Sequence, residues 1–184
     1  MDPVRSLGLD KHVVELVPHR SEWARAFVEE EVRLRGGLSP LACEIEHVGS
    51  TSVPGLPAKP ILDLAIGVAS GNDVAAILSG LDRLGYAYMG DAGVEGGHVL
   101  MRESALHVRT HHLHVVTLED PQWEAYLLFR DFLRRDASAR DAYAAEKATL
   151  AALHPTDREA YTAAKDEIAR RLILEARHTL QAAN

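Results

Sequence analysis

The feature that most constrains the fold is an almost continuous apolar run, Ile61–Val68, interrupted only by Asp63. A run that is apolar at every alternate position on both faces is typical of a strand covered on both sides. A carboxylate inside such a strand is costly to bury unless hydrogen bonds or a metal ion stabilise it. The run therefore predicts a central strand of a layered sheet, with Asp63 as a candidate functional residue. The alternative is a structural Asp satisfied by Lys59 or by loop amides.

Strand and helix patterns alternate through the first part of the chain. A helix is expected from an N-cap at Ser21 to a stop at Gly36-Gly37, and another over 72–84. The first helix has an apolar face composed of Trp23, Phe27, Val28, Val32 and Leu34. Further strands are expected at 41–48, 86–89, 98–102 and 106–116, with a Gly-rich turn (Gly90, Gly93, Gly96, Gly97) between the second and third of these. The strands from Tyr86 onward are expected to form an antiparallel meander.

The remainder of the sequence is helical in pattern. Asp120-Pro121 is a cap followed by proline at the first helical position, and an Ala-rich helix runs through Tyr143 and Leu150. Thr156 and Glu159 have the spacing of a capping box that opens a long last helix. The sequence thus predicts an α+β fold: a single domain over 1–184, with a sheet-based part (1–119) and a helical part (120–184) packed on it.

Charge and composition narrow the classes of partner. The formal net charge is −7, and basic residues occur as short doublets, so a long nucleic acid is not expected, whereas a small nucleotide is compatible. No stretch approaches the ~20 apolar residues of a membrane span. Cys43 is the single cysteine and cannot form an internal disulfide, which favours a reducing compartment. We therefore expect a cytoplasmic protein.

A Gly-Ser turn follows the strand that ends at Val48. Small residues let a phosphate approach the main chain, and exposed N–H and O–H groups can donate to its oxygens. Lys59 is placed to add a cation, and the candidate phosphate contacts are Gly49, Ser50, Thr51 and Ser52. Glu46 or His47, just before the turn, could supply a general base. The alternative is an ordinary solvated loop.

Histidines cluster in the last expected strand. His112 and His114 alternate with apolar residues and so share one face of the strand, while His111 points the other way. Two imidazoles on one face are typical of a metal site, and equally of hydrogen-bonded histidines on a polar sheet face. Arg109, beside this strand, is a candidate phosphate contact.

The block from Ile45 to Leu64 resembles the signature of GrpB-like proteins, which are themselves similar to the polymerase-β-type nucleotidyltransferase superfamily. The similarity continues at 112–115, 128–134 and 161–165. The resemblance implies a nucleotidyltransferase-like mixed sheet flanked by helices, a nucleoside triphosphate as ligand, and a divalent metal ion such as Mg²⁺, Mn²⁺ or Zn²⁺.

The superfamily pattern is only partly present. Gly49-Ser50 match the pair that holds nucleotide phosphates, and Asp63 matches the first acid of an Asp-x-Asp pair, but the second acid falls on Ala65. A two-metal mechanism needs carboxylates that bridge two ions ~3.5–4 Å apart. The resemblance therefore leaves either one metal held by Asp63, His112 and His114, or none.

Three functions are compatible with this sequence. The first is a metal-dependent nucleotidyltransferase acting on a small molecule. The second is a catalytically degenerate module that binds a nucleotide or a phosphorylated metabolite. The third is a metal-dependent hydrolase or phosphotransferase that uses the His-rich strand. The replacement of a bridging acid by Ala65 favours the second.

Overall fold

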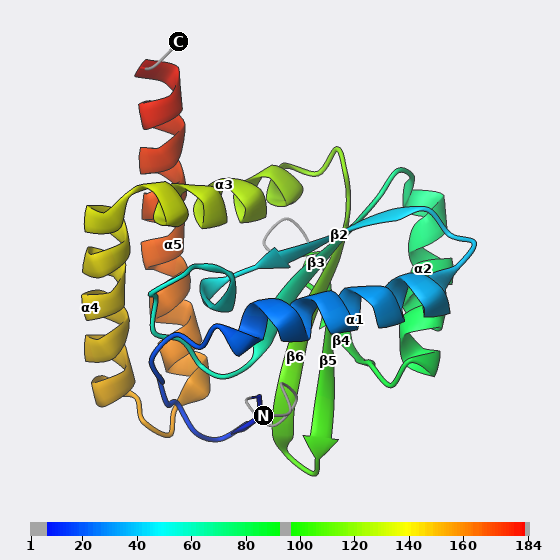
Figure 1. The fold of residues 1–184 in the computed structure, drawn as a ribbon, viewed down its shortest axis with the longest axis horizontal. Coiled ribbons are helices and arrows are strands. Elements are labelled where there is room, and N and C mark those ends of the chain that lie inside the picture. Colours follow the sequence, from blue (N-terminus) through cyan, green and yellow to red (C-terminus); the bar gives the residue numbers. More distant parts are fainter. Residues whose placement is uncertain (1–6, 93–96, 183–184) are drawn as a thin grey trace.

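The computed structural model describes residues 7–92 and 97–182 of the chain (Figure 1). The elements in chain order are β1 (Leu9–Asp10), α1 (Glu22–Leu38), β2 (Cys43–Val48), the 3₁₀ turn η2 (Ser50–Ser52), β3 (Leu62–Val68), α2 (Gly71–Arg83), β4 (Ala87–Asp91), β5 (His98–Ala105), β6 (Val108–Thr117), α3 (Pro121–Arg135), α4 (Ala137–Leu153) and α5 (Arg158–Ala182).

The strands form one mixed sheet in the order β2-β3-β6-β5-β4, with β1 paired to β6. β3 and β6 are parallel, and the other neighbours are antiparallel. The predicted mixed sheet flanked by helices is confirmed, and so is the meander β4-β5-β6. Part of the predicted Gly-rich turn, Gly93 and Gly96, lies outside the described residues.

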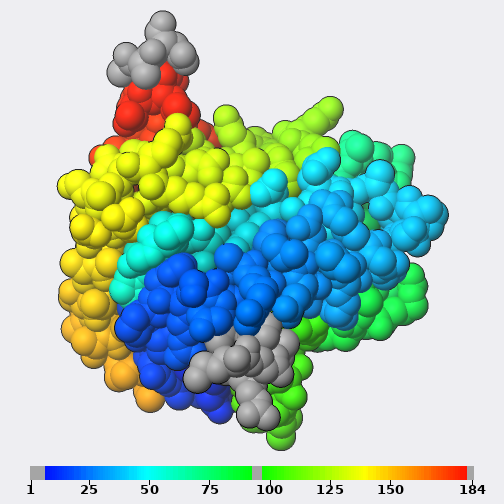
Figure 2. Space-filling view, viewed as in Figure 1, coloured from blue at the N-terminus to red at the C-terminus, as the bar shows by residue number. Residues whose placement is uncertain are grey.

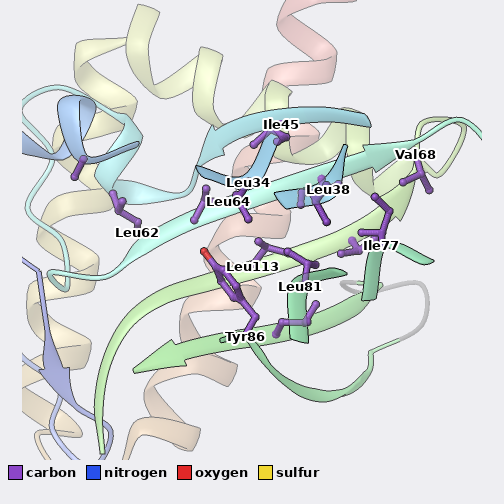
Figure 3. Close-up of a cluster of buried hydrophobic side chains, with 14 of the residues drawn as sticks. Leu34, Leu38, Ile45, Leu62, Leu64, Val68, Ile77, Leu81, Tyr86 and Leu113 are labelled. Atoms are coloured by element: carbon purple, nitrogen blue, oxygen red, sulfur yellow. The ribbon is translucent and has the colours of Figure 1, made fainter. Parts of the chain in front are cut away.

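The central strand β3 has two different faces. Leu62, Leu64, Ile66 and Val68 are fully buried against α1 and α2, together with Leu34, Leu38, Ile77 and Leu81 (Figure 3). Each such side chain contributes about 1.5–3 kcal/mol when it is removed from water. Because side chains alternate along a strand, Asp63, Ala65 and Gly67 face the opposite layer. The apolar core thus fixes the direction in which the lone acid points.

The opposite layer consists of α3, α4 and α5. α3 contacts β2, β3 and β6, and at Gly67 an added Cβ would lie 3.0 Å from the ring of Trp123, so the glycine makes room for α3. A second apolar cluster joins the loop after η2 to these helices through Val53, Leu56, Leu133 and Leu172, among others. Figure 2 shows this loop (turquoise) between α1 (blue) and the C-terminal helices (yellow to orange).

Several expected helix boundaries were wrong. α1 continues through Gly36-Gly37 because Leu38 is buried in the core, and Ser21 has a helical backbone without a capping hydrogen bond to the described residues. Val28 and Val32 are 54% and 68% exposed and do not belong to the inward face.

The caps of the later helices were predicted more successfully. Asp120 caps α3 as expected, because its side chain accepts a hydrogen bond from the Gln122 N–H and Pro121 follows it. For α5 the capping residue is Asp157, which accepts from the Ala160 N–H, and the predicted Thr156 is therefore one residue too early.

A buried polar cluster lies on the α1 side of the sheet. Glu30, 5% exposed, accepts hydrogen bonds from Arg33, Arg102 and the Tyr86 hydroxyl. His111 points into this cluster, with Nε2 3.3 Å from Arg102 Nη2, as expected from its opposite direction to His112. The cluster connects α1 with β5 and β6, and its hydrogen bonds satisfy both oxygens of the Glu30 carboxylate.

Among the described residues, no helix combines the length and the apolar character that crossing a membrane requires.

Candidate functional site

The Gly-Ser turn and the lone acid lie next to each other. Val48, the last residue of β2, is the Cα partner of Asp63 in β3. Gly49 then adopts φ +66°, and a Cβ at this position would be 2.4 Å from Asp63 Oδ2. Only glycine combines this backbone conformation with this approach to a carboxylate. The sheet register and the glycine therefore place the η2 turn directly beside Asp63.

Two of the three hydroxyl groups stabilise the turn from within. Ser52 Oγ donates to the Gly49 carbonyl over 2.7 Å, and Thr51 Oγ1 is 2.9 Å from His47 Nε2. Both residues are buried, and Arg134 of α3 donates twice to the Ser52 carbonyl. These contacts favour a structural role for Thr51 and Ser52 over the predicted phosphate contact. Ser50 is half-buried and remains the hydroxyl best placed to reach a ligand.

Asp63 is an ionised carboxylate that lies beside His112. Its side chain is 32% exposed, and Oδ1 lies 3.2 Å from His112 Nδ1. Burial alone would raise the pKa of Asp63, but the hydrogen bond and charge of His112, with the charges of Lys165 and Lys59, lower it to about 2. Asp63 is therefore suited to hold a cation or a polar group and unsuited to donate a proton.

His112 and His114 of β6 lie on the same side of the sheet as Asp63 of β3. Their ring centroids are 4.5 Å apart, and the ring of His114 is 5.0 Å from that of Tyr126 in α3. Within residues 7–92 and 97–182, no three His, Cys, Asp or Glu side chains form a group that could hold a metal ion. Metal binding by Asp63, His112 and His114 stays a prediction.

Glu46 and His47 join β2 to its surroundings. Arg130 of α3 donates to Glu46 Oε2 over 2.6 Å and to the His47 carbonyl over 3.2 Å. The His47 ring stacks on Phe27 with centroids 4.9 Å apart, and burial lowers its pKa to about 4. These contacts favour structural roles for Glu46 and His47. A general-base role for either residue stays a prediction.

Glu46 also lies beside Ala65, the position at which the second acid of the superfamily pattern is missing. It is the Cα partner of Ala65, whose partner on the other side is His114. The nearest carboxylate in register with the missing acid is therefore one strand away, where it is paired with Arg130.

Two lysines lie near the turn, Lys147 on α4 and Lys59 in the loop before β3. Lys147 of α4 is 1% exposed, and its Nζ donates to Ser50 Oγ over 3.0 Å and to the Pro57 carbonyl over 2.5 Å. Lys59 Nζ lies 4.9 Å from the ring centroid of Tyr161 in α5. Burial, together with repulsion from neighbouring cations, lowers the pKa of both Lys147 and Lys59 to about 7. Both therefore titrate near neutral pH.

The helical layer contributes residues that the sequence reasoning missed. Lys165 and Arg158 of α5 act electrostatically on Asp63 or Lys59, as does Lys147 of α4. The available signal was a repeated spacing, Tyr143 to Lys147 and Tyr161 to Lys165, which places a lysine one helical turn after an inward-facing tyrosine. Arg109 was predicted to meet a phosphate; it lies on β6, where its charge acts on Arg158 of α5.

Comparison with solved structures defines the class of the fold. It is similar to a chain of the GLD-2/RNP-8 complex (TM-score 0.54, 13% identity, 94% of this chain and 52% of that one). It is also similar to the Cid1 poly(U) polymerase with MgGTP bound (TM-score 0.50, 14% identity, 73% and 44%). At this identity the likeness shows the fold alone: a nucleotidyltransferase-like mixed sheet with flanking helices.

Residues 13–175 match the GrpB protein family, and the chain belongs to that family. The crystal structure of the conserved protein GrpB from Enterococcus faecalis is similar over 91% of this chain and 99% of that one, with a TM-score of 0.79 and 32% identity. The glutamate-rich protein GrpB of Alkalihalophilus pseudofirmus is 31% identical over 92% of this chain and 99% of its own length. A UPF0157 protein of Pseudomonas aeruginosa is 38% identical over 94% of this chain and 71% of its own length. The chain spans 45% of the UPF0157 protein YqkA of Bacillus subtilis, to which it is 37% identical.

Proposed function

We propose that this protein binds a nucleotide or another phosphorylated small molecule where the Gly49-Ser50 turn, Asp63 and the lysines of the helical layer meet. The observation that carries the proposal is the contact of the buried Lys147 ammonium with Ser50 Oγ, at 3.0 Å. This contact brings a cation and a hydroxyl together in the fold, beside Gly49 with its positive φ. Together they offer the positive charge and the short polar donors that a phosphate oxygen requires.

The local charge balance supports an anionic ligand. Lys59, Lys147, Lys165 and Arg158 surround two carboxylates, Asp63 and Asp166, although the whole chain carries a net charge of −7. The lysines also repel one another, because the charge of Lys165 lowers the pKa of both Lys59 and Lys147. A bound phosphate would offset this repulsion.

Transfer of a nucleoside monophosphate to a small acceptor is the second candidate. It is favoured by the ionised Asp63, whose carboxylate is partly exposed beside His112 and could help to hold a divalent cation with bound phosphates. It is disfavoured by Ala65 and by the pairing of Glu46 with Arg130, which leave no second free carboxylate in that row. A binding function therefore agrees better with these residues than transfer does.

The experiment is a thermal-shift and calorimetric titration of the full chain with ATP, GTP, CTP, UTP and pyrophosphate, with and without Mg²⁺ or Mn²⁺. A ligand at 100 times its Kd adds about 2.7 kcal/mol to the free energy of unfolding, or a Tm rise of roughly 5–10 °C for a chain of this size. Ser50→Ala should weaken binding, whereas Ser79→Ala, on the exposed side of α2, should not. A flat response to every ligand would contradict the proposal.

Asp63→Asn separates the two candidates. If Asp63 serves a metal-dependent transfer, the substitution should abolish the part of the binding that depends on Mg²⁺ or Mn²⁺. If the pocket binds the anion alone, removal of a negative charge should leave affinity unchanged or increase it. Loss of metal-free binding in this variant would contradict both readings.

A further inference from the structure

Two arginines near Lys59 carry buried N–H groups that have no acceptor among the described residues. Arg109 Nε and Arg158 Nη1 are buried and unpaired within the described part of the chain. The nearest carboxylate oxygen to Arg109 Nε is Glu103 Oε1, 3.9 Å away, which is beyond hydrogen-bond distance. A guanidinium is permanently charged and offers only donors, so a buried unpaired N–H on it is costly.

Both arginines lie close to the segment Lys59-Pro60. Arg158 opens α5 three residues before Tyr161, whose ring lies against Lys59 Nζ. The Gly8 N–H donates to the Pro60 carbonyl over 2.8 Å, and the next residue, Leu9, is the Cα partner of Arg109. Lys59-Pro60 and Arg109 therefore flank the same short segment. Repulsion by Arg109 is the largest charge effect that lowers the pKa of Arg158, after burial.

This arrangement is unfavourable without a partner for the two groups. Like charges are held near each other, and donors that water would satisfy are buried. An oxyanion at this position would accept from both forks and offset the repulsion, which is the geometry in which arginine recognises phosphates and carboxylates. Arg109 is 19% exposed along its side chain, so its edge can be reached from outside.

We propose that Arg109 and Arg158 form a second oxyanion subsite, distinct from the Gly49-Ser50 turn. The inference rests on the proposed function, because it assigns a second anionic group to the same ligand. Arg109 precedes His112, the Cα partner of Asp63, by three residues of β6. The ligand would thus carry two separate anionic groups instead of one phosphate chain alone.

The test uses Arg109→Gln and Arg158→Gln in the full chain, with Arg83→Gln on the exposed side of α2 as a control of equal charge change. The probes are inorganic phosphate and succinate, at an ionic strength held constant with NaCl, and the readout is the Tm of each variant. We expect each subsite variant to bind phosphate or succinate about 10-fold more weakly than wild type. Without any anion, their Tm should equal or exceed that of Arg83→Gln, because a repulsion has been removed. The probe that loses more affinity identifies the subsite as one for phosphate or for carboxylate.

The outcomes separate the two proposals. If Ser50→Ala weakens phosphate binding while Arg109→Gln and Arg158→Gln bind like Arg83→Gln, the second subsite is wrong and the proposed function stands. If wild type responds to neither anion nor any nucleotide, both are wrong. A Tm of the anion-free variants more than about 5 °C below that of Arg83→Gln, which corresponds to a loss above ~1 kcal/mol in a chain of this size, would show that the arginines are structural and would overturn the subsite.

Discussion

The backbone of Gly49 lies against the carboxylate of Asp63, so closely that a Cβ at Gly49 would be 2.4 Å from Asp63 Oδ2 and 2.7 Å from Asp63 Cβ. Turn and acid are thus a single unit, because neither can shift without displacing the other. The unit is positioned by the antiparallel pairing of β2 with β3, in which Val48 is opposite Asp63.

Gly49→Ala should therefore be strongly destabilising. The substitution forces a side chain into φ +66° and into contact with Asp63, and we expect a loss of at least about 2 kcal/mol in the free energy of unfolding. Urea denaturation measures this loss. Gly36→Ala is the matched control: it lies inside α1 with nothing within 4 Å of an added Cβ, and it should stabilise by up to about 1 kcal/mol. Equal effects of the two substitutions would contradict the geometry described.

Glu30→Ala should be among the most destabilising substitutions on the other face of the sheet. It leaves Arg33, Arg102 and the Tyr86 hydroxyl without their shared acceptor, and breaking a buried ion pair in this way costs about 3–5 kcal/mol. Glu29→Ala, on the exposed side of the same helix, should change stability by less than about 0.5 kcal/mol. Denaturant titration of both variants tests the difference, and a loss below about 1 kcal/mol for Glu30→Ala would be unexpected.

The buried lysines predict that stability rises with pH above neutrality. The pKa of Lys147 is about 7 in the folded chain and near its ordinary value of 10.5 when unfolded, so the unfolded chain binds more protons between these limits. Raising the pH from 7 to 9 should therefore increase stability through Lys147 by up to about 1.4 kcal/mol per pH unit. Lys147→Met should flatten the profile. Stability that falls between pH 7 and pH 9 in wild type would contradict the burial of this ammonium group.

Anion affinity should change with pH in the opposite direction. Lys59 and Lys147 attract an anion only when they are protonated, and both have a pKa of about 7 in the free protein. Binding of sulfate, whose own charge is constant in this range, should weaken as the pH rises from 7 to 9 and should be accompanied by proton uptake. Calorimetry in buffers of different ionisation enthalpy measures that uptake. Affinity that does not depend on pH would exclude both lysines from the anion site.

The sheet and the position of Asp63 could be predicted because their signals are local. An apolar run with one acid defines β3, and alternation along β6 separates His112 and His114 from His111. Helix ends were harder, because Leu38 is drawn into the core and extends α1 past two glycines, an effect of tertiary packing that outweighs local preference.

Among the basic residues of the proposed site Lys59 was predicted, whereas Lys147, Lys165 and Arg158 were not, for a different reason. Lys147 and Ser50 are 97 positions apart in the chain, and their contact depends on how α4 packs beside the η2 turn. Thr51 and Ser52 illustrate the converse: a hydroxyl-rich turn indicates donors, but only the fold decides that Thr51 bonds His47 and Ser52 bonds Gly49. Residue type suggested the chemistry, and long-range packing assigned the partners.

The lysines held by α4 and α5 have one more consequence. The charge of Lys165 lowers the pKa of Lys147, so these two cations of α5 and α4 repel each other whenever both are protonated. Such a repulsion lowers the stability of the folded chain, and a loss of stability of this kind is common at functional sites. A bound anion would act as a counter-ion between these lysines and would hold α4 and α5 more tightly on the sheet. Amide exchange along these two helices should then be slower with the anion than without it.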